Sequence, residues 1–201
     1  LKEDITELIE ESTDGLTRVK DIVENLKNFS LESTEGVQTV DVCTICNQLI
    51  TLISAQYSAP HYKFECEHEK VEVMGNPGPL KQALMNVMIN AAQAIETKGF
   101  VKLSVIEKGD SVVIKILDSG CGIPVKHRKR LFEPFFTTKP EGQGQGLGLS
   151  VAYTAIEQHQ GKISISSKEN KGTVVEITIP KQLSCLENES IDSELDSPLT
   201  P

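Results

Sequence analysis

Hydrophobic residues recur with a helical period over the first thirty positions of the chain. They follow one another at spacings of mostly three and four, at Leu1, Ile5, Leu8, Ile9, Leu16, Val19, Val23, Leu26 and Phe29. This spacing predicts one long helix over 1–31 with a single apolar stripe. The stripe predicts pairing with a second copy of the chain or with an upstream segment; a helix lying on its own domain is the alternative. The polar segment 32–37 is predicted to be a linker.

From residue 38 onward, alternating stretches and helical stretches follow each other. Alternation predicts strands over 38–42, 63–67, 71–74, 101–107, 112–117, 162–167 and 174–179. Helical spacing predicts helices over 44–58, 77–95 and 147–160. These elements favour an α/β sandwich of the α+β kind, with helices covering one face of a mixed, mostly antiparallel sheet. We expect a domain over 38–180, preceded by the long helix and followed by a disordered acidic tail over 181–201.

Composition and charge restrict the function of the chain. Of its 201 residues, 20 are basic and 29 are acidic, so the formal net charge is −9. No basic face is available to neutralise nucleic-acid phosphates or anionic lipid, and we expect neither a nucleic-acid partner nor direct membrane contact. No apolar run approaches the ~20 residues of a spanning helix. The chain opens with Leu-Lys-Glu-Asp, which is neither an initiator methionine nor a signal peptide, and we interpret it as part of a longer, cytoplasmic protein with or without a membrane anchor elsewhere.

The cysteines also favour a cytoplasmic location. They are odd in number and scattered, at Cys43, Cys46, Cys66, Cys121 and Cys185, which predicts reduced thiols. The Cys-x-x-Cys at 43–46 opens a helical stretch, so we expect these two cysteines to lie in the core; a redox or zinc role is the alternative.

Amide side chains line one face of the helix predicted to end at Ile95. The positions Gln82, Asn86, Asn90 and Gln93 lie three or four residues apart, opposite an apolar stripe. A solvated face usually carries Lys and Glu, so this face is predicted to look onto a ligand, with a tolerant helix surface as the alternative. An Asn carbonyl oxygen suits Mg²⁺ that takes its other ligands from phosphates and water.

Two glycine-containing segments are further candidates. Asp118-Ser-Gly-Cys-Gly-Ile-Pro follows a strand, where its carboxylate can accept a hydrogen bond from an amine such as that of adenine; a plain Asp-Gly turn is the alternative. Glycines alternate from 142 to 148 directly before a helix, which offers backbone amides to phosphate oxygens; a flexible linker is the alternative. Neither common phosphate loop, GxxxxGK[ST] or GxGxxG, is matched.

The motifs gain specificity from their order along the chain. Asn86-Val-Met-Ile-Asn-Ala-Ala-Gln-Ala is followed by the Asp118 turn, by Phe132-Glu-Pro-Phe-Phe-Thr-Thr-Lys, by Gly144-Gln-Gly-Leu-Gly-Leu and by Gly172-Thr. This series resembles the N, G1, F, G2 and G3 boxes of the catalytic ATP-binding domain of sensor histidine kinases. The stretch 18–30 also resembles the second helix of that family's dimerisation and phosphotransfer hairpin.

The resemblance implies a role for each matching residue. Asn90 would coordinate Mg²⁺, Asn86 would support the phosphate side, Asp118 would bind the adenine amine, and Lys139 would reach the terminal phosphates. Asn86 and Lys139 would be the catalytic residues. The other nucleotide contacts implied are Gly120, Gly122, Ile123, Phe132, Thr138, Gly144, Gln145, Gly146, Leu147, Gly148 and Thr173.

The implied activity is ATP-dependent phosphorylation of a His, with transfer onward to the Asp of a response-regulator receiver domain. The implied assembly is a homodimer through the N-terminal helix. A non-catalytic ATP-binding scaffold and a Ser-directed relative are the alternatives.

Two departures refine this interpretation. Asn86 stands where related ATPases of the gyrase, chaperone and MutL kind carry a Glu that activates water, so ATP hydrolysis is predicted to be slow. The family's phosphoacceptor box is absent from this stretch. All four histidines are predicted to be surface or structural residues, namely His61, His68, His127 and His159.

Overall fold

The computed structural model describes residues 36–139 and 144–183, so the predicted N-terminal helix and the segment 184–201 lie outside the described residues. The elements follow in the order β1 (Gln38–Asp41), α2 (Val42–Gln56), β2 (Pro60–Cys66), β3 (Glu72–Gly75), α3 (Pro77–Gln93), β4 (Gly99–Lys108), β5 (Ser111–Asp118), η1 (Val125–Arg130), α4 (Gly148–Gln158), β6 (Lys162–Lys168) and β7 (Gly172–Pro180).

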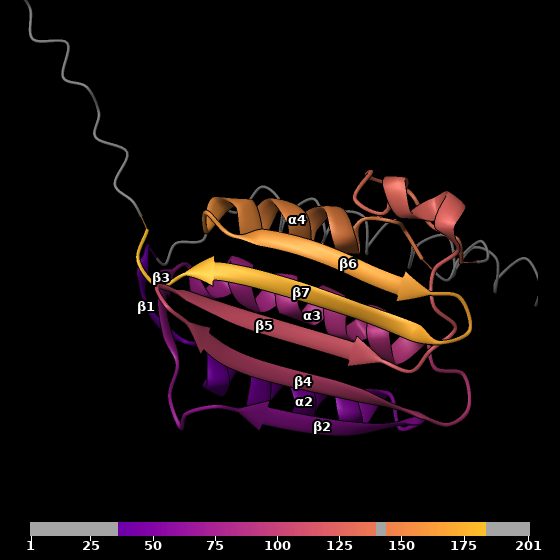
Figure 1. Ribbon diagram of the computed structural model, residues 1–201, viewed down its shortest axis with the longest axis horizontal. Coiled ribbons are helices and arrows are strands. Elements are labelled where there is room, and N and C mark those ends of the chain that lie inside the picture. Colours follow the sequence, from indigo (N-terminus) through magenta and orange to yellow (C-terminus); the bar gives the residue numbers. More distant parts are fainter. Residues whose placement is uncertain (1–35, 140–143, 184–201) are drawn as a thin grey trace, which may run out of the picture.

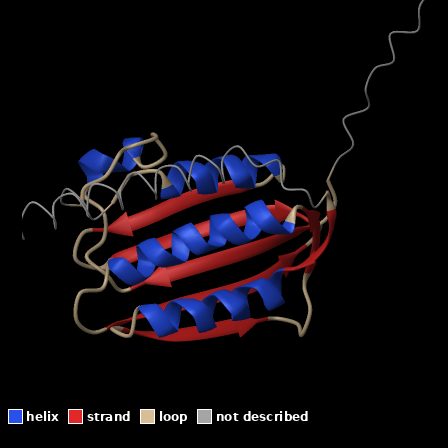
Figure 2. Cartoon of the chain, turned by 180° about the vertical axis from the view of Figure 1, so that it is seen from behind, coloured by secondary structure: helices blue, strands red, loops and turns tan. Residues whose placement is uncertain are grey.

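Five of the strands form one sheet in the order β2-β4-β5-β7-β6, and β1 pairs with β3 in a separate small sheet. Only the β2–β4 pair of the large sheet is parallel. The helices α2, α3 and α4 lie side by side across one face of this sheet (Figures 1 and 2). The predicted fold class, a mixed and mostly antiparallel sheet covered on one face by helices, is therefore confirmed. The short 3₁₀ helix η1 was not predicted.

The core lies between the sheet and the helices. Every second residue is buried along β5 and β7 and over 101–105 of β4, which places the side chains of one strand face against the helices. From the helices come the apolar stripes that the sequence pattern predicted, with Leu49 of α2, Leu84 and Met88 of α3 and Ile156 of α4 fully buried. Within the described residues, no helix combines the length and the apolar character needed to cross a bilayer.

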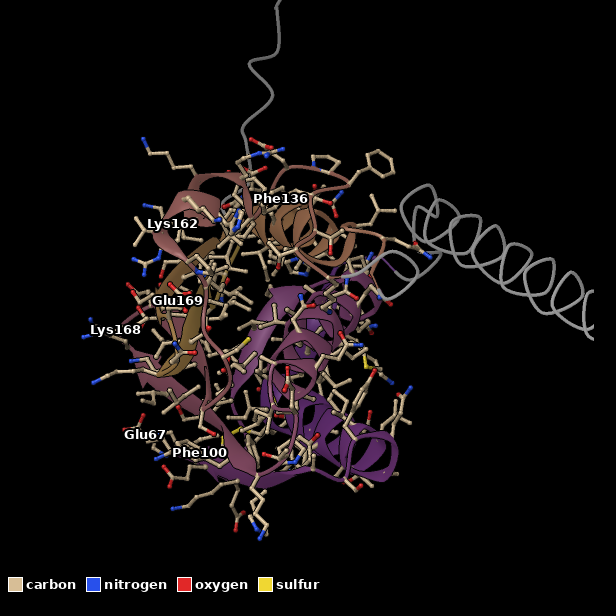
Figure 3. All side chains as sticks on the ribbon, turned by 90° about the vertical axis from the view of Figure 1, so that its right-hand side faces the viewer. Glu67, Phe100, Phe136, Lys162, Lys168 and Glu169 are labelled. Atoms are coloured by element: carbon tan, nitrogen blue, oxygen red, sulfur yellow. A yellow bond between two sulfur atoms is a disulfide. The ribbon has the colours of Figure 1, made fainter. Side chains whose placement is uncertain are left out.

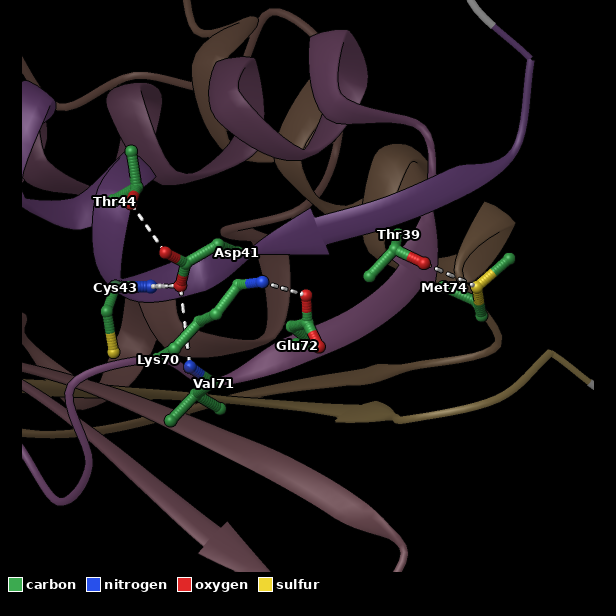
Figure 4. Close-up of polar contacts among 8 residues, drawn as sticks. All are labelled: Thr39, Asp41, Cys43, Thr44, Lys70, Val71, Glu72 and Met74. Atoms are coloured by element: carbon green, nitrogen blue, oxygen red, sulfur yellow. Dashed lines mark hydrogen bonds and ion pairs between the residues drawn. The ribbon is translucent and has the colours of Figure 1, made fainter.

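The start of α2 is fixed by Asp41, the last residue of β1. Its carboxylate accepts hydrogen bonds from the backbone N–H of Cys43 at 3.0 Å and from the hydroxyl of Thr44, which caps the helix (Figure 4). The backbone N–H of Val71 also donates to it, at 3.4 Å. Burial alone would raise the pKa of Asp41, but these hydrogen bonds outweigh it and lower the pKa. The helix therefore begins two residues earlier than predicted, since its cap precedes the Cys-x-x-Cys.

One prediction about the cysteines is wrong in the structure. Cys43 forms a disulfide with Cys66 at the end of β2, with a Cα–Cα distance of 6.5 Å, so these two are not reduced thiols. Proximity of a helix start and a strand end explains the pairing, which no spacing in the sequence indicates. Cys46 is buried in the core as predicted, and burial raises the pKa of its thiol to about 12. Among the described residues, no cluster of His, Cys, Asp or Glu supports the zinc alternative.

The buried His159 joins α4 to the start of α3. Its Nε2 accepts a hydrogen bond from the backbone N–H of Asn76 at 2.9 Å, while Nδ1 lies 2.6 Å from the carbonyl oxygen of Ala155 and donates to it. A side chain at Gly75 would collide with this ring. His159 is therefore a structural residue, as predicted, and it fixes the relative position of the two helices that flank the candidate site.

Candidate functional site

A cleft of ≈ 1070 Å³ opens between α3, the start of α4 and the turn that follows β5. It lies at the end of the sheet drawn on the right in Figure 1, where β5 ends and β7 begins. All of the residues that the sequence predicted to bind nucleotide line it, except Gly120 and Phe132. Segments between positions 86 and 173 of the chain thus meet around one cavity, and its size suits a nucleotide.

The α3 wall of the cleft carries the predicted amide face. Asn86 is held at both ends of its amide: Nδ2 donates to the Gly148 carbonyl at 3.1 Å, and Oδ1 accepts from Gln82 at 3.0 Å. This side chain therefore ties α3 to the first residue of α4. The second amide of this face, one turn further along the helix, is Asn90, which lines the same cleft.

Asn90 faces a cation. The ammonium Nζ of Lys139 lies 3.4 Å from Asn90 Oδ1 and also donates to Gln93 Oε1. Burial lowers the pKa of Lys139, and the nearby Cys121 opposes this effect more weakly. The amide oxygen of Asn90 is therefore turned into the cleft toward a positive charge, as a ligand for a divalent cation would be.

Asp118 lines the cleft from the last position of β5 and is 3% exposed. Its Oδ1 accepts two backbone hydrogen bonds, from Gly120 at 2.8 Å and from Thr173 at 3.2 Å. No described residue donates to Oδ2, so one carboxylate oxygen is left for a ligand. Burial raises the pKa of Asp118, and the two backbone hydrogen bonds only partly offset this.

The turn after Asp118 is clamped from two sides. The backbone N–H of Cys121 donates to the Ala94 carbonyl at the end of α3, and the Cys121 carbonyl accepts from Asn170 in the β6–β7 turn. Gly122 has a φ of 69°, and a Cβ there would collide with the carbonyl at the end of β6. Glycine is thus required by both the left-handed backbone and the close approach of a neighbouring strand. Figure 3 views this end of the molecule.

The glycine-rich segment reaches the cleft as α4 begins. Gly144 to Gly148 all line the cleft, and α4 starts at Gly148 without a side-chain cap. The backbone N–H groups of a first helical turn without a cap are donors suited to phosphate oxygens. Gly146 has a φ of 69° and lies against the backbone of Phe135, so this loop packs on the phenylalanine segment rather than extending into solvent.

The phenylalanines of 132–139 have different surroundings. Phe132 does not line the cleft; its ring packs against Tyr153 of α4, with the ring centroids 5.2 Å apart. Phe136 lines the cleft and lies under the guanidinium of Arg130, at 4.4 Å from ring centroid to Cζ. Phe135 is 69% exposed. These positions anchor the segment on η1 and α4 at the edge of the cleft.

Some residues around the cleft were not predicted. Cys121, Leu131, Phe136 and Thr137 line it, as do the inward-facing strand residues Ile165 and Val175. Strand alternation beside Thr173 would have indicated the last two. Gly120 supports the site without lining it, because a side chain there would collide with Ala94 at the end of α3.

The family of the chain follows from comparison with known proteins. Residues 75–183 match the family described as histidine kinase-, DNA gyrase B-, and HSP90-like ATPase. This match covers more than half of the 201 residues, and the chain belongs to this family.

Several of the similar proteins are kinases by name. Sensor histidine kinase ZraS of Escherichia coli K12 is 33% identical over 179 residues, which are 88% of this chain and 37% of ZraS. Sporulation kinase E of Bacillus subtilis is 33% identical over 84% of this chain and 23% of its own length. The chain thus spans well under half the length of these relatives. In structure, the catalytic domain of histidine kinase ThkA matches with a TM-score of 0.67 and 30% identity, over 74% of this chain and 97% of that one.

Proposed function

We propose that the chain is the ATP-binding catalytic part of a sensor histidine kinase in a two-component system. The observation that carries the proposal is the cleft, which combines an open carboxylate oxygen on Asp118 with the Asn90–Lys139 pair. A base with an exocyclic amine suits Asp118, which would mark the base end of the cleft, and a charged polyphosphate suits the Asn90–Lys139 pair, which would mark the phosphate end. The similarity to ZraS over 88% of this chain supports the same assignment.

At the phosphate end, Lys139 and the start of α4 would hold the terminal phosphates of ATP. Mg²⁺ fits this end because the oxygen of Asn90 already faces a cation, and an amide oxygen is a suitable ligand for it. When bound, Mg²⁺ supplies charge neutralisation between the phosphates. Lys139, which contacts both Asn90 and Gln93, would exchange these contacts for phosphate oxygens.

The reaction would be a transfer of the γ-phosphoryl group to an imidazole nitrogen on the first helix of the phosphotransfer hairpin, which this stretch of sequence does not include. A nitrogen–phosphorus bond forms as the bond to the β-phosphate oxygen breaks, and the electron pair leaves on ADP. Phosphoryl transfer depends mainly on positioning and charge stabilisation, which the cleft offers. A carboxamide is too weak a base to activate water, and both ends of the Asn86 amide are engaged in hydrogen bonds, so ATP would be retained for the transfer.

The partners and compartment of the proposed kinase follow from this assignment. A structure of ThkA in complex with response regulator protein TrrA, at 28% identity and a TM-score of 0.68 over 84% of this chain, supports a receiver domain as the phosphoryl acceptor. We further propose a homodimer through the N-terminal helix and a location in the cytoplasm, where ATP is available.

The test is a phosphotransfer assay. The chain is mixed with the phosphoacceptor hairpin of ZraS and γ-labelled ATP, with Asn90→Ala as the inactive comparison. We expect label on the hairpin that is stable in alkali and lost in acid, the behaviour of a phosphohistidine. Label that is stable in acid would indicate a Ser kinase. Nucleotide binding without any transfer would indicate a scaffold and refute the proposal.

A further inference from the structure

A hydroxyl network under the base end of the cleft involves Ser167, a residue that does not line the cleft. Ser167 is in β6, directly across from Thr173 of β7 in the strand register. Thr173 in turn pairs with Asp118 of β5. Three neighbouring strands therefore bring Ser167, Thr173 and Asp118 into one row that ends at the cleft.

Three contacts surround the hydroxyl of Ser167. The backbone N–H of Ile123 donates to Oγ at 2.8 Å, Oγ donates to the Gly172 carbonyl at 3.0 Å, and Thr173 Oγ1 lies 2.9 Å away. A serine hydroxyl has one proton and two lone pairs. An N–H can only donate and a carbonyl can only accept, so all three contacts are hydrogen bonds together only if the serine proton goes to Gly172. In that arrangement Thr173 is the donor of the third hydrogen bond, to Ser167.

This direction decides what Thr173 offers to a ligand. Its single hydroxyl proton is turned toward Ser167, so only lone pairs remain for the cleft, which Thr173 lines. The adjacent Asp118 has Oδ1 filled by two backbone N–H groups and Oδ2 left for a ligand. The base end of the cleft therefore presents hydrogen-bond acceptors from both side chains.

We propose that Ser167 is a positioning residue that sets the purine specificity of the cleft. By holding the Thr173 proton away from the ligand, it makes the site complementary to the amine at C6 of adenine and mismatched with an oxygen at that position. Without Ser167, the Thr173 hydroxyl rotates freely and donates to such an oxygen. The inference rests on the proposed nucleotide binding and adds the residue that selects the base.

The experiment compares ADP with inosine diphosphate, which carries an oxygen in place of the C6 amine. Dissociation constants of both, with Mg²⁺, are measured by calorimetry for the unmodified chain and for Ser167→Ala. We expect the preference for ADP to fall about tenfold, the effect of one reoriented hydrogen bond. Ser167→Thr retains the hydroxyl and should restore the preference. Ser166→Ala is the matched control, because Ser166 is exposed on the opposite face of the same strand.

A cycle with Thr173→Val separates a positioning role from a structural one. If Ser167 acts through Thr173, adding Ser167→Ala to Thr173→Val changes the ADP preference no further. The inference is overturned if Ser167→Ala weakens both nucleotides equally, or if it shifts the preference in the Thr173→Val background. Failure of the unmodified, folded chain to bind either nucleotide would instead overturn the proposed function. Thermal unfolding of each variant identifies any that fail to fold.

Discussion

Replacing Asp118 by Asn tests the base end of the cleft most directly. Two backbone N–H groups donate to Oδ1, at 2.8 Å from Gly120 and 3.2 Å from Thr173. An Asn side chain keeps both hydrogen bonds only if its carbonyl oxygen takes that position, and its NH₂ group then occupies the Oδ2 position. The NH₂ group, a hydrogen-bond donor, would then face the amine of the base, in place of the carboxylate oxygen that accepts from it.

The size of the effect follows from this exchange. The lost interaction is a hydrogen bond to a charged acceptor, worth about 1.5–3 kcal/mol, so the dissociation constant for ADP should rise roughly 10- to 150-fold. Isothermal titration calorimetry measures it, with Asp110→Asn as the control. Asp110 lies in the exposed β4–β5 turn, so the same chemical change there should leave ADP binding within about twofold.

The Asp118→Asn substitution should weaken ADP binding but should not lower the stability of the folded chain. Burial raises the pKa of the Asp118 carboxyl in the folded state above its value in the unfolded chain. The stability that this carboxyl contributes is therefore fully present at a pH below its unfolded pKa, and it is lost as the pH rises through its folded pKa. At pH 7 the buried charge therefore costs stability, and Asp118→Asn should melt at the same or a higher temperature than the unmodified chain. The difference in melting temperature between the variant and the unmodified chain should shrink as the pH is lowered toward 4. An Asn variant that binds ADP within threefold of the original, or melts well below it at pH 7, would refute this reasoning.

Three further predictions concern the turn, the disulfide and the metal end. Gly122→Ala should lower the free energy of urea unfolding by clearly more than Gly109→Ala, because both have positive φ but only Gly122 lies against a strand backbone; equal losses would contradict this. A reductant should lower the free energy of urea unfolding by about 3 kcal/mol, since the Cys43–Cys66 disulfide closes a loop with a sequence separation of 23. The control is the Cys43→Ser variant, in which the reductant should cause no change. Asn90→Ala should abolish the Mg²⁺-dependent part of ATP affinity while binding in EDTA changes less than about twofold, and an unchanged Mg²⁺ dependence would exclude Asn90 as a ligand.

The sequence by itself determined the order and kind of the elements and most of the cleft. Periodicity is a local property, so the alternation of β4 and β5 and the two faces of α3 could be read from neighbouring positions. The Asn, Asp and glycine motifs marked the cleft because each carries its chemistry within a few residues. Element ends were less certain, as at α2, whose capping Asp41 lies just before its predicted start.

Only the tertiary structure decided which distant residues meet. His159 bonds to Asn76 across 83 positions, and Ser167 reaches Ile123 across 44; neither pair has a local signal. The Ser167 contact depends on the strand order β2-β4-β5-β7-β6, in which β7 pairs with the distant strand β5 and carries β6 at the edge of the sheet. The direction of the hydrogen bond between Thr173 and Ser167 can be assigned only when all the neighbours of the Ser167 hydroxyl are known. The sheet brings these neighbours together, so the sequence alone does not reveal them.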